Sequence, residues 1–149
     1  MPNWIIHNKW TDLAGIDKKI ANYVDRTIDY AGNWAIEDDL GESHDLEELV
    51  VVRQLKFFYD KDLKKKSNSK LEHVKAYYVH HLLDYFRETR YDINDLEFIF
   101  EAYLREKVPV AIKDDNNNIV NFSQELKEIF QLLREHKTEF YGDLRRGIS

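Results

Sequence analysis

The chain has 149 residues and a formal net charge of −6, from 22 basic and 28 acidic side chains. This length suits one domain with a substantial core, and we expect residues 1–149 to form a single domain. The acidic balance argues against general nucleic-acid binding, which needs a basic surface. Cysteine is absent, which excludes disulfides, thiolate metal sites and cysteine nucleophiles. Any metal must therefore be held by nitrogen and oxygen ligands.

Turn-forming residues are scarce and aromatic residues abundant, with 5 Gly and 2 Pro against 3 Trp, 9 Tyr and 8 Phe. The scarcity favours long uninterrupted elements and argues against a sandwich or barrel. We predict an all-α bundle of five to six helices whose core is built from large side chains. Neither a membrane-spanning apolar run nor a signal-peptide pattern is found in the sequence, so we expect a cytoplasmic protein without a membrane partner.

Apolar periodicity and capping patterns place the helices in chain order. The predicted helices cover residues 2–14, 17–31, 45–59, 71–90, 94–107 and 123–141. The third is apolar nearly all round at Val50, Val51 and Val52, and we expect it to be the most buried element. A strand is the alternative there, but the flanking residues favour helix. Asp114 to Asn118 form a turn signal between β-branched residues, which predicts a small β-hairpin near residues 110–120.

The helix predicted over residues 71–90 (LEHVKAYYVHHLLDYFRETR) combines apolar faces with one polar stripe. At about 100° per residue, His73, Tyr77, His80, Asp84 and Glu88 lie on one face. Apolar side chains cover most of the remaining circumference. The stripe is either a solvated polar face or one wall of a metal or acid–base site.

The spacing of His80 and Asp84 is the strongest local signal for chemistry. Residues four apart lie one turn apart on one helix face and can share an ion. An imidazole with a carboxylate suits a divalent ion such as zinc, manganese or iron. His73 lies about 10 Å away along the helix axis, too far to share that ion directly. The spacing alone also occurs often by chance.

Three earlier residues can extend this site. His44 and Asp45 stand side by side at a predicted helix start, where both can reach one ion or Asp45 can simply be an N-cap. His7 lies in WIIHNKW, where a packed histidine among aromatic rings is the simpler interpretation. Because a bundle can bring successive helices together, we predict metal ligation by His7, His44, Asp45, His80 and Asp84. His80 and Asp84 should then approach His44 and Asp45 closely enough to share an ion.

The order of these residues resembles two all-α families of metal-dependent phosphoesterases. HD-domain phosphohydrolases use a His, a His–Asp doublet and a later Asp, to which His7, His44–Asp45 and Asp84 correspond. Zinc-dependent phospholipase C-like proteins have an N-terminal Trp, an early His and an HxxxD helix, to which Trp4, His7 and His80–Asp84 are similar. The resemblance covers scattered residues and no continuous motif.

Two functions are compatible with the sequence. The first is a metal-dependent hydrolase of a small phosphate ester such as a nucleotide, in which the ion activates water. His73 or His81 would serve as a further ligand or base. Arg87, or a lysine among Lys64, Lys65 and Lys66, would balance phosphate charge. The alternative is a non-enzymatic helical interaction module or homodimer with incidental histidines. The high aromatic content predicts exposed apolar surface and a homo-oligomer.

Overall fold

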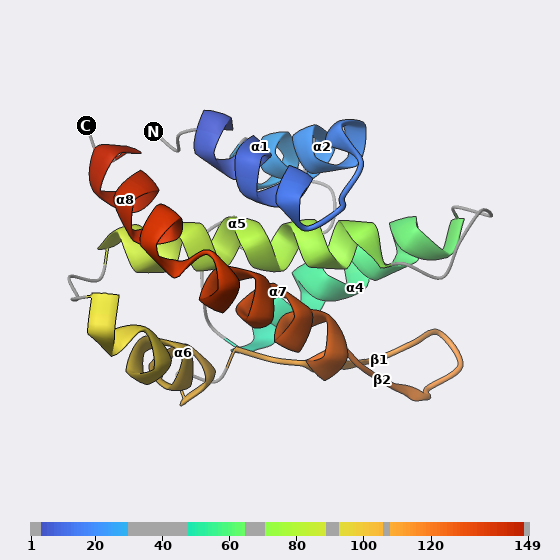
Figure 1. Cartoon of the computed structure of the whole chain (residues 1–149). Helices are drawn as coiled ribbons and strands as arrows, with labels where there is room; N and C mark the ends of the chain where they lie inside the picture. The colour runs from blue at the N-terminus through green and yellow to red at the C-terminus, as the bar shows by residue number, and fades with distance from the viewer. Residues whose placement is uncertain (1–3, 30–47, 65–70, 89–92, 106–107, 148–149) are drawn as a thin grey trace.

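The computed structural model describes residues 4–29, 48–64, 71–88, 93–105 and 108–147 (Figure 1). This part of the chain contains seven α-helices, a 3-10 turn and one antiparallel two-stranded sheet. The elements are α1 (Trp4–Leu13), α2 (Lys18–Asp29), α4 (Glu48–Lys64), α5 (Glu72–Glu88), η2 (Ile93–Asp95), α6 (Leu96–Arg105), β1 (Ala111–Lys113), β2 (Ile119–Asn121), α7 (Ser123–Glu135) and α8 (Lys137–Gly147). The predicted all-α class with a small hairpin is confirmed.

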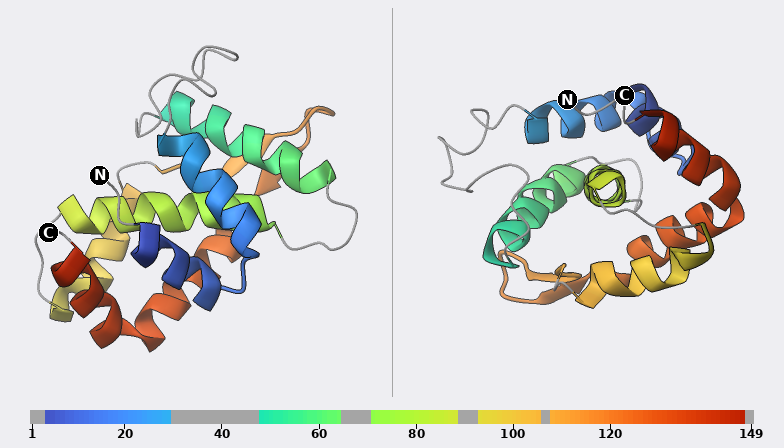
Figure 2. Two further views of the ribbon diagram at one scale, coloured as in Figure 1. Left: turned by 90° about the horizontal axis from the view of Figure 1, so that it is seen from above. Right: turned by 90° about the vertical axis from the view of Figure 1, so that its left-hand side faces the viewer.

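Helix α5 lies at the centre of the molecule. Seen along its axis, it is surrounded by the other helices (Figure 2), and it contacts α1, α2, α4, α7 and α8. From Glu72 to Leu83 every side chain is buried except Lys75, which is half-buried. Because α5 is apolar on several sides, it can pack on several sides at once. Its polar stripe therefore faces the interior and requires polar partners there.

The expectation that the helix around Val51 is the most buried element is wrong. Helix α4 buries one stripe, made by Val51, Gln54, Leu55, Phe58 and Asp62, while Arg53 is exposed. The spacing of these positions is that of one helix face, and α4 uses this face against α5 and β1. The other described side chains of α4 are half-buried or exposed.

A cluster of phenylalanines connects α5 to the C-terminal helices. The ring centroid of Phe86 lies 5.5 Å from that of Phe100 and 5.3 Å from that of Phe140. The rings of Phe100 and Phe130 stack with their centroids 4.4 Å apart. All four side chains are buried. Such pairs contribute about 0.5–1.5 kcal/mol each beyond their buried area. The cluster fixes α6, α7 and α8 against the end of α5 that carries Asp84.

The predicted last helix is two helices in the structure. Helix α7 ends at Glu135. The backbone of its C-cap, His136, leaves the helical region at φ −120° and ψ 31°, and α8 begins at Lys137. The bend lets the chain continue around α5 (Figure 2), so that Leu133 and Phe140 are both buried. Neither Gly nor Pro stands at residues 132–139, so no sequence signal marked the break.

Two tight turns set the remaining geometry. Between α1 and α2, Gly15 adopts φ 77°, and the N–H groups of Gly15 and Ile16 bond to the carbonyls of Asp12 and Thr11. This is a Schellman motif, which glycine favours because it has no Cβ. It folds α2 back beside α1. In the hairpin, β1 pairs with β2 with Ile112 opposite Val120.

None of the helices in the described part of the chain combines the length and the apolarity needed to cross a bilayer.

Candidate metal centre

Three side chains from two helices converge where α1 packs on α5. Helix α5 supplies His80 and Asp84, and α1, which packs across it, supplies His7. One donor atom from each residue lies within 4.8 Å of the others. Within the described residues, this is the group of His, Asp and Glu side chains that could hold an ion. His7 is 3% exposed, His80 0% and Asp84 13%.

The separations between donor atoms fit one shared ion. His80 Nε2 lies 3.2 Å from Asp84 Oδ2, and His7 Nε2 lies 3.5 Å from Asp84 Oδ1. The two imidazole rings are 4.5 Å apart between centroids and tilted by 48°. Ligand bonds of about 2.1 Å at tetrahedral angles place two donor atoms about 3.4 Å apart. The two histidines and the carboxylate can therefore close on an ion with small side-chain movements.

A second carboxylate orients His80 from the opposite side. Asp25 on α2 is 1% exposed, and its Oδ1 lies 2.9 Å from His80 Nδ1. An ionised carboxylate can only accept, so Nδ1 carries the hydrogen of this bond. The Nε2 atom, which a metal would use, then points toward Asp84 and His7. A carboxylate behind the ligating imidazole is the usual outer-shell partner of metal-binding histidines.

Asp25 was missed by the sequence reasoning, although the sequence contains a signal. It stands four residues after Ala21 and three before Ile28, both of which are buried. A carboxylate at helical spacing within an apolar stripe must find a buried partner, because an unpaired buried charge is costly. Its partner, His80, is 55 residues away in the sequence, which no local pattern reveals.

The other histidines of α5 lie elsewhere. His73 Nδ1 bonds to Asp62 Oδ1 at 2.8 Å, and the same carboxylate accepts the backbone N–H groups of His73 and Val74. Asp62 thus caps the start of α5, where the helix dipole favours a negative charge. The pair is separate from the three-residue group. The ring of His81 packs 4.4 Å from that of Tyr77 and 6.1 Å from that of His80.

The remaining predicted site residues are not placed by the structure. His44 and Asp45 lie outside the described residues, so their predicted approach to His80 and Asp84 stays a prediction. Arg87 belongs to α5, but its side chain is not among those described.

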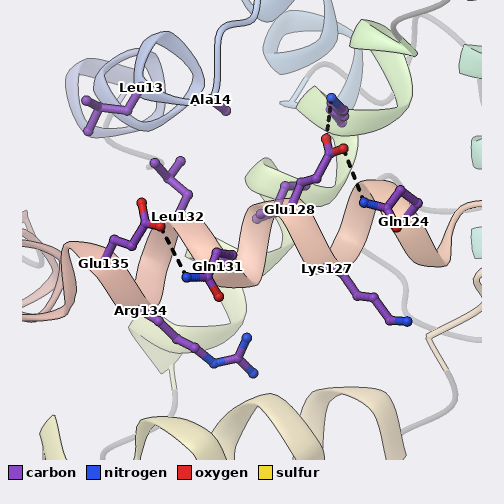
Figure 3. A pocket seen from close by; sticks show the side chains of 11 residues that line it. Leu13, Ala14, Gln124, Lys127, Glu128, Gln131, Leu132, Arg134 and Glu135 are labelled. Carbon is purple, nitrogen blue, oxygen red and sulfur yellow. Dashed lines mark hydrogen bonds and ion pairs between the residues drawn. The ribbon is translucent and has the colours of Figure 1, made fainter.

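An open depression of about 730 Å³ lies at a different place, between the end of α1 and α7 (Figure 3). Paired polar side chains line much of it: Lys75 contacts Glu128 at 2.7 Å, and Gln131 contacts Glu135 at 3.1 Å. Its lining includes none of the residues of the metal group or Asp25. We interpret it as the solvated face of α7.

Comparison of the chain with protein-family models, with curated proteins and with solved structures finds no match.

Proposed function

We propose that the protein binds one divalent transition-metal ion through His7, His80 and Asp84 and uses it to hydrolyse a phosphate ester. One observation carries the proposal. His80 is fully buried, bonded at Nδ1 by Asp25, and turned at Nε2 toward Asp84. A buried histidine held between carboxylates, with a second histidine beside it, matches the ligand and outer-shell arrangement of metal centres.

The number of protein ligands favours a catalytic over a structural ion. Structural zinc sites have four protein ligands, whereas catalytic sites have three and leave a position for water or substrate. His7, His80 and Asp84 make such a set of three. A bound ion would lower the pKa of its water enough to form hydroxide near neutral pH. Zinc is the first choice, but two imidazoles and one carboxylate also suit iron, and manganese accepts carboxylate ligands.

The chain's own residues would divide the work. Asp25 orients His80, and the packing of α1 brings His7 to the ion. Asp84 is the most exposed of the three ligands, which favours an open coordination position on its side. The choice of a phosphate ester rests on the resemblance of His7 and His80–Asp84 to phosphoesterase residues. Arg87 is the proposed partner of the phosphate charge.

The test is hydrolysis of simple phosphate esters by protein reloaded with zinc, manganese or iron(II) after chelation. We expect turnover of p-nitrophenyl phosphate, its bis ester or a nucleotide only when metal is present, and loss of turnover in His80→Ala. A protein that binds the ion through these residues yet hydrolyses none of these esters would contradict the hydrolase.

A non-enzymatic interaction module is the second candidate. The observation that favours it is exposed apolar surface: Ile5 is 81% exposed, Phe98 61% and Ile119 74%. These side chains come from α1, α6 and β2, and exposed apolar residues mark interfaces only where they form a contiguous patch. Light scattering tests the homo-oligomer that this candidate predicts. A monomer at high concentration, together with bound metal, would leave the hydrolase as the better account.

A further inference from the structure

Helix α1 is joined to the C-terminal helix through one buried carboxylate. Oδ2 of Asp143 on α8 accepts a hydrogen bond from Trp10 Nε1 at 3.1 Å and another from Lys9 Nζ at 2.6 Å. Asp143 is 7% exposed and Trp10 1%. These contacts span more than 130 residues of sequence. They connect the first and last helices of the described chain.

The same contacts contribute to the rotation of α1 about its axis, beside its packing on α2 and α5. The rings of Trp10 and Phe140 pack edge-to-face with their centroids 5.2 Å apart, so that the indole is held by an apolar ring as well as by Asp143. The hydrogen bonds that Lys9 donates to the carboxylates of Asp143 and Glu139 raise the pKa of Lys9. Trp10 lies three residues after His7, and residues three apart share a helix face. A rotation that withdrew Trp10 from Asp143 would also move His7.

His7 is the one member of the metal group that does not come from α5. Two ligands on α5 are set relative to each other by the helix itself, because their spacing is one turn. The third depends on where α1 lies. Thr11 is buried and lies one turn after His7, and its hydroxyl donates a hydrogen bond to the His7 carbonyl at 2.9 Å. This bond lies within α1 and does not connect α1 to another helix.

We propose that Asp143 is a positioning residue of the metal centre, which holds α1 through its hydrogen bond with Trp10 so that His7 reaches the ion bound by His80 and Asp84. The inference rests on the proposed function, since it concerns the affinity of that site. Sites of this kind lose affinity or activity when their supporting contacts let a ligand drift by about 1 Å. Asp143 touches neither the ion nor the substrate and acts only through α1.

The experiment measures zinc and cobalt affinity of the full chain with Asp143→Ala and with a matched control, Glu139→Ala. Both variants remove an α8 carboxylate that pairs with Lys9, since Glu139 Oε1 lies 2.7 Å from Lys9 Nζ. Only Asp143 also bonds to Trp10. All proteins are compared at a temperature at which circular dichroism shows them folded. The absorption bands of bound cobalt report directly which ligands hold the ion. A loss of stability alone does not change these bands.

We expect Asp143→Ala to bind zinc about tenfold more weakly, at the lower end of the effect of outer-shell partners, and to shift the cobalt bands. Glu139→Ala should stay within about twofold of the wild type, a spread well below that effect. Trp10→Phe removes the same hydrogen bond from its other end and replaces Asp143→Ala if that variant does not fold. In the double variant, Asp143→Ala with Trp10→Phe, the two losses of zinc affinity should not add, because both substitutions remove the same hydrogen bond.

Two failures are distinguishable. A wild-type protein that binds no metal contradicts the proposed function and, with it, the positioning role. A wild-type protein that binds metal while Asp143→Ala and Trp10→Phe keep its affinity and cobalt spectrum contradicts the positioning role alone. An equal loss in Glu139→Ala would also overturn it, because Lys9 pairing rather than the Trp10 anchor would then be responsible.

Discussion

Replacing Asp25 with Asn probes the metal centre with the smallest change in shape. The carboxylate is 1% exposed and lies 2.9 Å from His80 Nδ1. Hydrogen bonds to charged groups contribute about 1.5–3 kcal/mol, which corresponds to about 10- to 100-fold in an equilibrium constant. Loss of an outer-shell partner weakens metal binding by a similar 10- to 100-fold. We therefore expect Asp25→Asn to bind zinc at least tenfold more weakly.

The amide adds a second effect with the same direction. Its NH₂ group can donate to Nδ1 of His80, which would place the ring hydrogen on Nε2, the atom that faces Asp84. A histidine in that tautomer offers no lone pair to an ion at Nε2. The two effects cannot be separated by affinity alone, and both predict weaker binding.

The assay is a competition titration of zinc against a chelating dye, with Asp62→Asn as the control. Asp62 forms the other buried His–Asp pair, 2.8 Å from His73 Nδ1 and with a side chain 2% exposed. Its replacement should cost about 1 kcal/mol of stability, because an amide has one acceptor oxygen where the Asp62 carboxylate uses two for the N–H groups of His73 and Val74, yet leave zinc affinity unchanged. Wild-type affinity in Asp25→Asn, or an equal loss in Asp62→Asn, would contradict a role of the Asp25 carboxylate in orienting His80.

Three further predictions concern the centre and the packing around it. His80→Ala should abolish metal binding while far-UV circular dichroism stays close to wild type; retained binding would remove His80 from the site. Phe86→Ala should cost about 3–5 kcal/mol in urea unfolding, because the ring is fully buried between two others; a cost below about 1 kcal/mol would contradict the described core. Glu97 pairs with Arg134 across α6 and α7, Nη2 to Oε2 at 3.0 Å, and these hydrogen bonds lower the pKa of the Glu97 carboxyl. Because the pKa is lower in the folded state, the pair stabilises the protein at pH values above the unfolded-state pKa. This stabilisation is lost as the pH falls through the folded-state pKa. Because the pair is exposed, Glu97→Gln should cost less than about 1 kcal/mol at pH 7 and nothing near pH 2; a cost that persists in acid would contradict the ionic origin.

The sequence predicted the part of the site that depends on local geometry alone. His80 and Asp84 lie one turn apart in any α-helix, so their convergence required no knowledge of the fold. The sequence left open whether their stripe faces solvent or the interior, and the structure places it inside because α5 is packed on several sides. His7 was included because successive helices of a bundle can meet, and the structure does bring it to the same group.

What could not be predicted depends on the packing of whole helices. Asp25 is one carboxylate in an amphipathic helix, and only the packing of α2 on α5 shows that it faces His80. The helix around Val51 is apolar nearly all round in the sequence, whereas the helix around Val79 carries a polar stripe, so periodicity favoured the wrong helix as the centre. Which of the two helices is central is decided by how many neighbours the chain folds around it. The bend at His136, which closes that ring of helices, has no Gly or Pro signal.

The measurement that tests the account most directly is the metal content of tag-free protein, with zinc, manganese and iron determined after equilibration and dialysis. We predict one ion per chain, and none in His80→Ala or His7→Ala. Wild-type protein that retains none of the three metals, or variants that retain as much as the wild type, would contradict a metal centre at His7, His80 and Asp84.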